Sequence, residues 1–76
     1  MTLKRAKQAM PDFVLEALKR AELLAAYEAR PPYQRNDYLL WINTAAKDET
    51  KARRMDKMLA ELKRGHGYMG MDWQPR

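Results

Sequence analysis

The fold is decided by one stretch, residues 48–65, which reads DETKARRMDKMLAELKRG. Its apolar residues recur at intervals of three, three, one and three positions, which places them on one face of a helix. They are Ala52, Met55, Met58, Leu59 and Leu62. Asp48 has the side chain of an N-cap, and Gly65 suits the left-handed position that follows a helix. The stretch therefore predicts an amphipathic helix from Glu49 to Arg64, with one face that needs a packing partner.

Upstream of this helix, the chain predicts three more helical stretches. They cover residues 11–19, 21–29 and 33–46. The second ends at Pro31 and Pro32, because neither ring nitrogen can donate a backbone hydrogen bond. The third places Tyr38 and Ile42 on one face, and we expect Tyr38 and Trp41 to pack with methionines of the last helix.

The composition agrees with an all-α fold, because residues with high helix propensity dominate and β-branched residues are few. A chain of 76 residues has room for one domain. We therefore predict a small bundle of four short helices over residues 11–65. A chain of this size buries only about 60% of its unfolded surface, so marginal stability or self-association is compatible with it.

The two ends of the chain lack an apolar period. Residues 1–10 form a basic segment that we expect to be a flexible arm, and residues 66–76 form a glycine-rich aromatic tail that we also expect to be flexible. Trp73 in this tail has two interpretations. It can act as a clasp on the bundle or as an anchor for a partner.

The charge balance suggests a binding surface. Fifteen Lys and Arg against 10 Asp and Glu give a net charge of +5 and a pI near 9.7. Basic residues of the last helix form stripes that could contact a partner or the phosphates of a nucleic acid. The candidates are Lys51, Arg53, Arg54 and Lys57. The alternative is a solvated helix face on which acids interrupt the bases.

The sequence gives no catalytic or cofactor-binding pattern. It has no cysteine, and His66 is its only histidine, so no nucleophile with a neighbouring base can be assigned. His66, Met69 and Met71 have soft donor atoms of the kind that Cu(I) prefers, but they are only a weak signal for a copper site. We expect no enzyme activity, cofactor or metal. No segment reads as a signal peptide or a membrane span, so the expected location is the cytoplasm.

Residues 31–65 carry a recognisable series of motifs. A double-proline turn is followed by an aromatic residue with a Trp-Ile pair, an alanine, a Glu-Thr step, two arginines and a closing glycine. These positions are Pro31, Pro32, Tyr38, Trp41, Ile42, Ala45, Glu49, Thr50, Arg53, Arg54 and Gly65. The series, with the upstream PDFVLEAL at residues 11–18, resembles the bacteriocin-protection, YdeI or OmpD-associated (OmdA) family.

The resemblance implies a small helical module without catalytic residues. Some bacterial members are associated with outer-membrane porin function and with resistance to bacteriocins or cationic peptides. The expectation that follows is a non-enzymatic interaction module with a protein partner, linked to envelope stress or to such resistance. Nucleic-acid binding through the basic face of the last helix stays open as the alternative.

Overall fold

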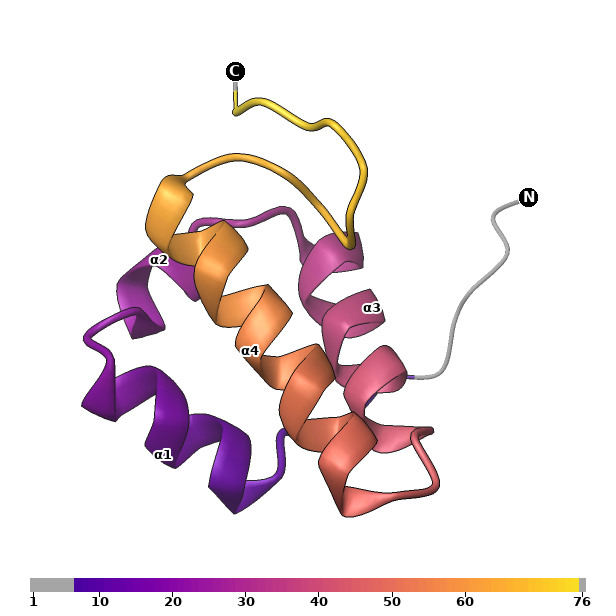
Figure 1. The fold of residues 1–76 in the computed structure, drawn as a ribbon. Helices are drawn as coiled ribbons and strands as arrows, with labels where there is room; N and C mark the ends of the chain where they lie inside the picture. Colours follow the sequence, from indigo (N-terminus) through magenta and orange to yellow (C-terminus); the bar gives the residue numbers. More distant parts are fainter. Residues whose placement is uncertain (1–6, 76) are drawn as a thin grey trace.

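Helix α4, Asp48–Arg64, runs through the middle of the molecule, and the other helices pack around it (Figure 1). This arrangement is seen in a computed structural model that describes residues 7–75. Helix α3 (Pro32–Asn43) packs along α4, and α2 (Leu24–Glu28) contacts both α4 and α1 (Asp12–Arg20). The predicted all-α bundle of four short helices is confirmed for the described residues. Residues 1–6 of the expected basic arm lie outside them.

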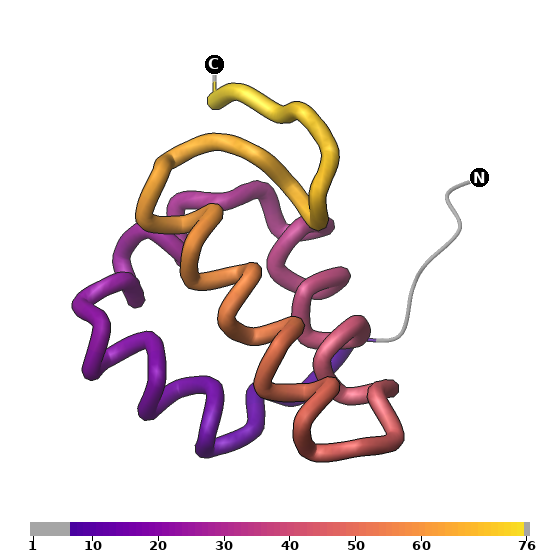
Figure 2. The backbone as a smooth tube through the Cα atoms, viewed as in Figure 1, coloured from indigo at the N-terminus to yellow at the C-terminus, as the bar shows by residue number. Residues whose placement is uncertain are grey.

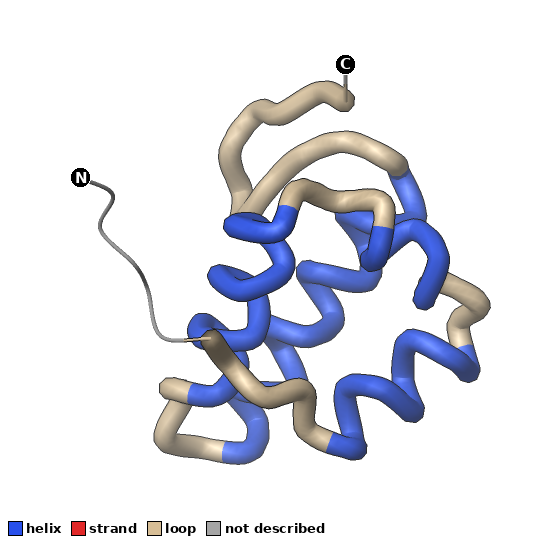
Figure 3. The backbone as a smooth tube through the Cα atoms, turned by 180° about the vertical axis from the view of Figure 1, so that it is seen from behind, coloured by secondary structure: helices blue, strands red, loops and turns tan. Residues whose placement is uncertain are grey.

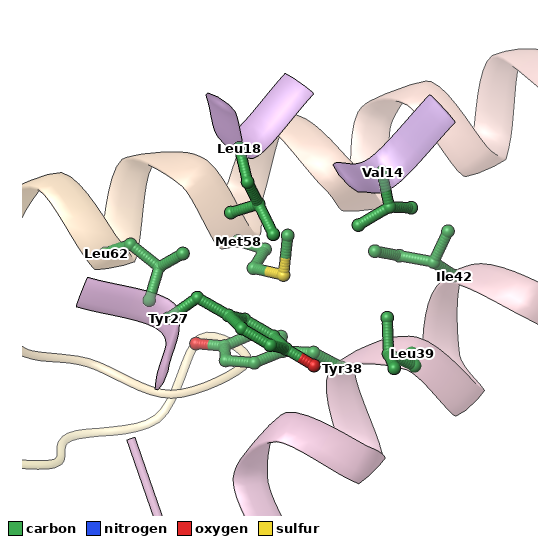
Figure 4. Packing of buried hydrophobic residues seen from close by; sticks show 8 residues of the cluster. All are labelled: Val14, Leu18, Tyr27, Tyr38, Leu39, Ile42, Met58 and Leu62. Atoms are coloured by element: carbon green, nitrogen blue, oxygen red, sulfur yellow. The ribbon is translucent and has the colours of Figure 1, made fainter. Parts of the chain in front are cut away.

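The core forms where the apolar faces of all four helices meet (Figure 4). Tyr38 and Met58 are fully buried near its centre, so the predicted packing of α3 against α4 is confirmed. The cluster consists of Val14, Leu18, Tyr27, Tyr38, Leu39, Ile42, Met58 and Leu62. Trp41 and Met55 pack against this cluster from its edge.

Helix α1 ends in a turn that shortens the second predicted helix. Leu23 N–H donates to the Leu18 carbonyl over 2.8 Å, and Glu22 N–H donates to the Lys19 carbonyl over 3.0 Å. These two bonds, with Glu22 at φ +60°, define a Schellman motif. The chain cannot be helical through a left-handed residue, so α2 begins at Leu24 rather than at Ala21.

Helix α3 stops three residues before its predicted end at Ala46 because its last carbonyls have other partners. Arg54 Nη1 donates to the Trp41 carbonyl over 2.6 Å. The Ala45 N–H, which would take that carbonyl in a continued α-helix, instead bonds the Ile42 carbonyl at 3.3 Å. The Thr44 hydroxyl also donates to the Leu40 carbonyl, which still accepts the helical bond from the Thr44 N–H at 2.9 Å.

The ends of α4 differ in how well they were predicted. The prediction of Asp48 as N-cap is wrong, because Lys47 occupies that position with extended backbone and no side-chain cap bond. Asp48 and Glu49 lie in the first turn, where acidic charge is favourable next to the helix dipole. Gly65 has φ +83°, so its predicted left-handed role after the helix is confirmed.

The segment after α4 crosses back over the bundle. It leaves the end of α4, reaches the first turn of α3 and then turns away toward the C-terminus (Figure 2). At the other end of the chain, Gln8 N–H donates to Asn36 Oδ1 over 2.7 Å, and Met10 packs against the core. Within the described residues, no helix has the length and apolar character to cross a membrane.

Candidate functional site

The four predicted contact residues of α4 divide into two pairs. Lys51 Nζ donates to the Asn43 carbonyl over 3.2 Å, and the Arg54 guanidinium both bonds the Trp41 carbonyl and lies 5.5 Å from the centre of the Trp41 ring. Carbonyls at a helix C-terminus carry partial negative charge, so both cations stabilise the end of α3. Lys51 and Arg54 therefore hold the turn between α3 and α4 in place.

Arg53 and Lys57 form the second pair. Both are exposed and lie one turn apart on the outer surface of α4. The four predicted contact residues are thus not equivalent, because two face solvent and two are engaged with the backbone of α3. Arg53 and Lys57 can therefore contact a partner while the described hydrogen bonds of the fold stay in place.

This division predicts unequal effects on stability. Arg54→Met should lower the free energy of unfolding by about 1 to 2 kcal/mol, because it removes a charged hydrogen bond to a helix C-terminus. Arg53→Met is the matched control and should stay within about 0.5 kcal/mol of the unsubstituted protein. Urea unfolding followed by circular dichroism measures both. Equal losses for the two variants would show that Arg54 has no special role in the turn.

A cluster of buried polar residues lies at the opposite end of α4, and sequence reasoning missed it. The Arg30 guanidinium is buried and donates to three acceptors: the Gly67 carbonyl at 2.6 Å, the Glu61 carbonyl at 3.0 Å and Gln34 Oε1 at 3.2 Å. Its planar face covers the Trp73 ring at 4.5 Å. Arg30 therefore joins the loop between α2 and α3 to the segment that follows α4.

Glu61 is the buried acid of this cluster, and the residue is only 2% exposed. Its carboxylate accepts hydrogen bonds from the Tyr38 hydroxyl at 2.5 Å, from Met69 N–H at 2.9 Å and from Gly70 N–H at 2.8 Å. Burial alone would raise the pKa of this carboxyl. The hydrogen bonds, helped by the charge of Lys57, outweigh burial and hold the pKa below its ordinary value.

The two backbone donors belong to a tight turn. Tyr68 and Met71 exchange two backbone hydrogen bonds of 2.9 Å, and the central residues Met69 and Gly70 have φ of +51° and +86°. Positive φ at both central positions is the signature of a type I′ turn, and it aims both N–H groups at Glu61. The Tyr68 ring meets Tyr38 edge to face, with ring centres 5.5 Å apart.

Trp73 completes the docking of the tail. Its carbonyl accepts a hydrogen bond from Gly67 N–H at 2.8 Å, while its ring lies under Arg30. The structure agrees with the first interpretation of Trp73, in which it acts as a clasp on the bundle. One sequence signal could have located this cluster, because Glu61 follows Met58 by three positions and precedes Leu62, which puts an acid on the apolar face of α4.

A groove of about 590 Å³ is lined by residues of α2, of α3 and of the segment before α1. Figure 3 shows the backbone of these elements from behind. The walls of the groove come from residues 7–8, from α2 and from the first two turns of α3. The lining residues are Lys7, Gln8, Tyr27, Pro32, Tyr33, Arg35, Asn36 and Leu39. The groove therefore combines aromatic and aliphatic surface with two positive charges and two amides.

Arg35 is the most unusual residue of the groove. Its Nε is buried and has no hydrogen-bond partner within residues 7–75. The neighbouring Tyr27 hydroxyl donates to the Arg35 carbonyl over 3.4 Å. Burial raises the pKa of Tyr27, and the positive charge of Arg35 partly opposes that shift. Arg35 thus brings an unsatisfied donor and a cation to a site that also offers aromatic surface.

Comparison with known families identifies the chain. The family model described as bacteriocin-protection, YdeI or OmpD-associated, abbreviated OmdA, matches residues 7–65. The chain belongs to the OmdA family. No match was found among curated proteins or among solved structures.

The OmdA match divides the functional features of the chain in an informative way. All the described lining residues of the groove lie inside the matched range, as do the two buried charged residues Arg30 and Glu61. The docked turn and Trp73 lie beyond its end at residue 65. In this OmdA chain, Arg30 and Glu61 of the matched range therefore hold the segment that follows residue 65.

The residues of the weak copper motif differ in exposure and packing. His66 is exposed, Met69 packs against the core and Met71 is 57% exposed, so the three side chains have different environments. Within residues 7–75, no three His, Cys, Asp or Glu side chains are grouped as a metal site would need.

Proposed function

We propose that this OmdA-family chain is a non-enzymatic protein-interaction module that binds a peptide segment of its partner in the groove lined by residues 7–8, α2 and α3. One observation carries this proposal: a concave site of about 590 Å³ whose lining mixes apolar and hydrogen-bonding groups. This volume lies within the range of about 300–1,000 Å³ typical of ligand sites. The role in bacteriocin or cationic-peptide resistance would then follow from the partner that is bound.

The groove is built on a rigid frame, which favours binding. Tyr27 and Leu39 line it and also belong to the buried core. The hydrogen bond from Gln8 N–H to Asn36 Oδ1 ties the first wall to α3. A preformed site loses less conformational entropy when a peptide binds, so little of the contact energy is used for ordering.

The chemistry of the lining supports binding rather than catalysis. It supplies an amine, a guanidinium, phenols and amides, which position a ligand through hydrogen bonds and charge. A reaction at this site would need one of these groups to be activated as a general base or nucleophile, and the described lining residues include no carboxylate or imidazole to activate it. The buried carboxylate of Glu61 is engaged with the tail instead.

Nucleic-acid binding by α4 is the second candidate function. The exposure of Arg53 and Lys57 favours it, whereas Lys51 and Arg54 already donate to carbonyls of α3 and have fewer donors left for phosphates. Counterion release scales with the number of phosphates contacted, so two cations give a weak salt dependence. We therefore place this candidate after peptide binding.

The test is selection from a random-sequence peptide library followed by mapping of the bound site. Selected peptides should shift the amide NMR signals of residues 33–39. Tyr33→Ala should weaken binding about tenfold, because an aromatic contact anchor is lost. Leu40→Ala is the matched control, since Leu40 is also an exposed apolar residue of α3 but does not line the groove, and it should change affinity less than about twofold.

Two outcomes would overturn the proposal. One is a library that yields no peptide binding at the groove. The other is a protein that binds labelled oligonucleotides at low salt, with the binding lost in Arg53→Glu but not in Tyr33→Ala, which would put the function on α4 instead.

A further inference from the structure

We infer that the groove recognises an acidic side chain of the partner peptide, an aspartate or glutamate carboxylate, which is held by Arg35 with Lys7 as the second cation. This inference rests on the proposed function, since it names the class of peptide that the groove takes. It begins from the charges of the lining, whose described residues include two cations and no acid. An anionic group is therefore the natural complement of this surface.

The unsatisfied Nε of Arg35 points to the same ligand. Buried N–H groups in folded proteins nearly always have an acceptor, and Arg35, which lines the groove, carries one that has none among residues 7–75. A carboxylate suits the role of acceptor because its two oxygens can accept the parallel N–H groups of a guanidinium. Arg35 lines the groove, and a carboxylate reaches its buried Nε once the Arg35 side chain turns toward the ligand.

The groove favours a carboxylate on a side chain over a carboxylate at a chain end. Capture of a C-terminal carboxylate commonly uses a nest of backbone N–H groups. Here the first turn of α3 begins with Pro31 and Pro32, which have no N–H to offer. The donors available to an anion are therefore side chains, Arg35 from α3 and Lys7 from the segment before α1.

The remaining lining residues set the neighbours of the acidic residue. Tyr33 is 51% exposed at the groove, and Tyr27 and Leu39 add apolar surface beside it. Aromatic side chains present large contact area at low entropic cost, so they select an apolar or aromatic residue of the peptide. The expected ligand is thus a short segment in which an acid lies next to an apolar residue.

The experiment uses peptides obtained from the library selection. For the unsubstituted protein, exchanging the acidic peptide residue for glutamine should weaken binding at least about tenfold, as expected for loss of a charged hydrogen-bonded pair. Arg35→Gln should cause a similar loss, and the two changes together should cost little more than either alone. Arg53→Gln removes the same charge away from the groove and should change affinity less than about twofold.

A second variant protects the test against misfolding of Arg35→Gln. Lys7 is exposed, so Lys7→Gln should leave the fold intact and still weaken binding of the acidic peptide by about threefold. Circular dichroism verifies the helical content of each variant.

The outcomes separate this inference from the proposed function. Peptides that bind the groove but carry no acid, or that bind Arg35→Gln equally well, would overturn the acidic-ligand assignment and leave peptide binding intact. Failure of any peptide to bind the groove would overturn the proposed function itself. If inorganic phosphate displaces the peptide at far lower concentration than acetate does, the groove is a phosphate site and the carboxylate assignment is wrong.

Discussion

Glu61→Ala should lower the free energy of unfolding by about 3 kcal/mol or more, the largest single effect expected in this chain. The substitution removes one acceptor from three donors, namely the Tyr38 hydroxyl and the N–H groups of Met69 and Gly70. A buried donor left without its acceptor costs about 1–3 kcal/mol, and the turn that carries two of these donors can restore their hydration by leaving the bundle. The loss is measured by urea unfolding.

Asp56→Ala is the matched control, since Asp56 is an exposed acid on the same helix. Its stability should change by no more than about 0.5 kcal/mol. If Glu61→Ala and Asp56→Ala were equally stable, the carboxylate of Glu61 would have no part in holding the turn.

The pH dependence of stability should carry the signature of Glu61. Because its pKa is lower in the folded protein than the ordinary value of 4.5, the unfolded chain binds a proton first as the pH falls. The contribution of Glu61 is therefore present above about pH 4.5 and is lost as the pH falls through the folded pKa. Glu61→Gln removes this titration, so the stability gap between the two proteins should narrow on acidification. A gap that stays constant from neutral to acidic pH would contradict the assignment.

Arg30→Met should have the second largest effect, a loss of about 2 to 4 kcal/mol with release of the tail. Methionine retains the apolar stem of arginine but cannot donate to the carbonyls of Gly67 and Glu61. Acceptors that lose a buried charged donor are left with their desolvation cost, and the Trp73 ring also loses its cation. Both effects act against the docked position of the tail.

Two measurements separate stability from docking in this variant. Urea unfolding gives the free energy, and tryptophan fluorescence should shift to longer wavelength as Trp73 becomes solvated. Arg53→Met serves again as control because Arg53 is exposed and makes no part of this cluster. An unshifted emission spectrum in Arg30→Met would mean that Trp73 is held by something other than Arg30.

The candidate sites were predictable to different degrees. Lys51, Arg53, Arg54 and Lys57 are evident as a basic series in the sequence, but only the fold separates the pair that caps α3 from the pair that faces solvent. The groove was not predictable at all. Its lining joins residues 7–8 to residues of α2 and α3, and no pattern along the chain links them.

By itself, the sequence determined the helices whose signals are local. The spacing of Met55, Met58 and Leu62 required α4 and its buried face, and Gly65 and the double proline marked chain reversals through their backbone preferences. The same local reasoning failed where a distant group overrode it. Helix α3 ends early because Arg54, thirteen positions away, takes its Trp41 carbonyl.

Only the tertiary structure decided how the charged residues are used. Arg30 looks like an ordinary surface residue, and Glu61 is marked only by its place on the apolar face of α4. Both are buried because partners from the tail satisfy their hydrogen bonds. The physical reason is that helix propensity and apolar spacing act within a few residues, whereas the cost of burying a charge is set by whatever the fold brings beside it.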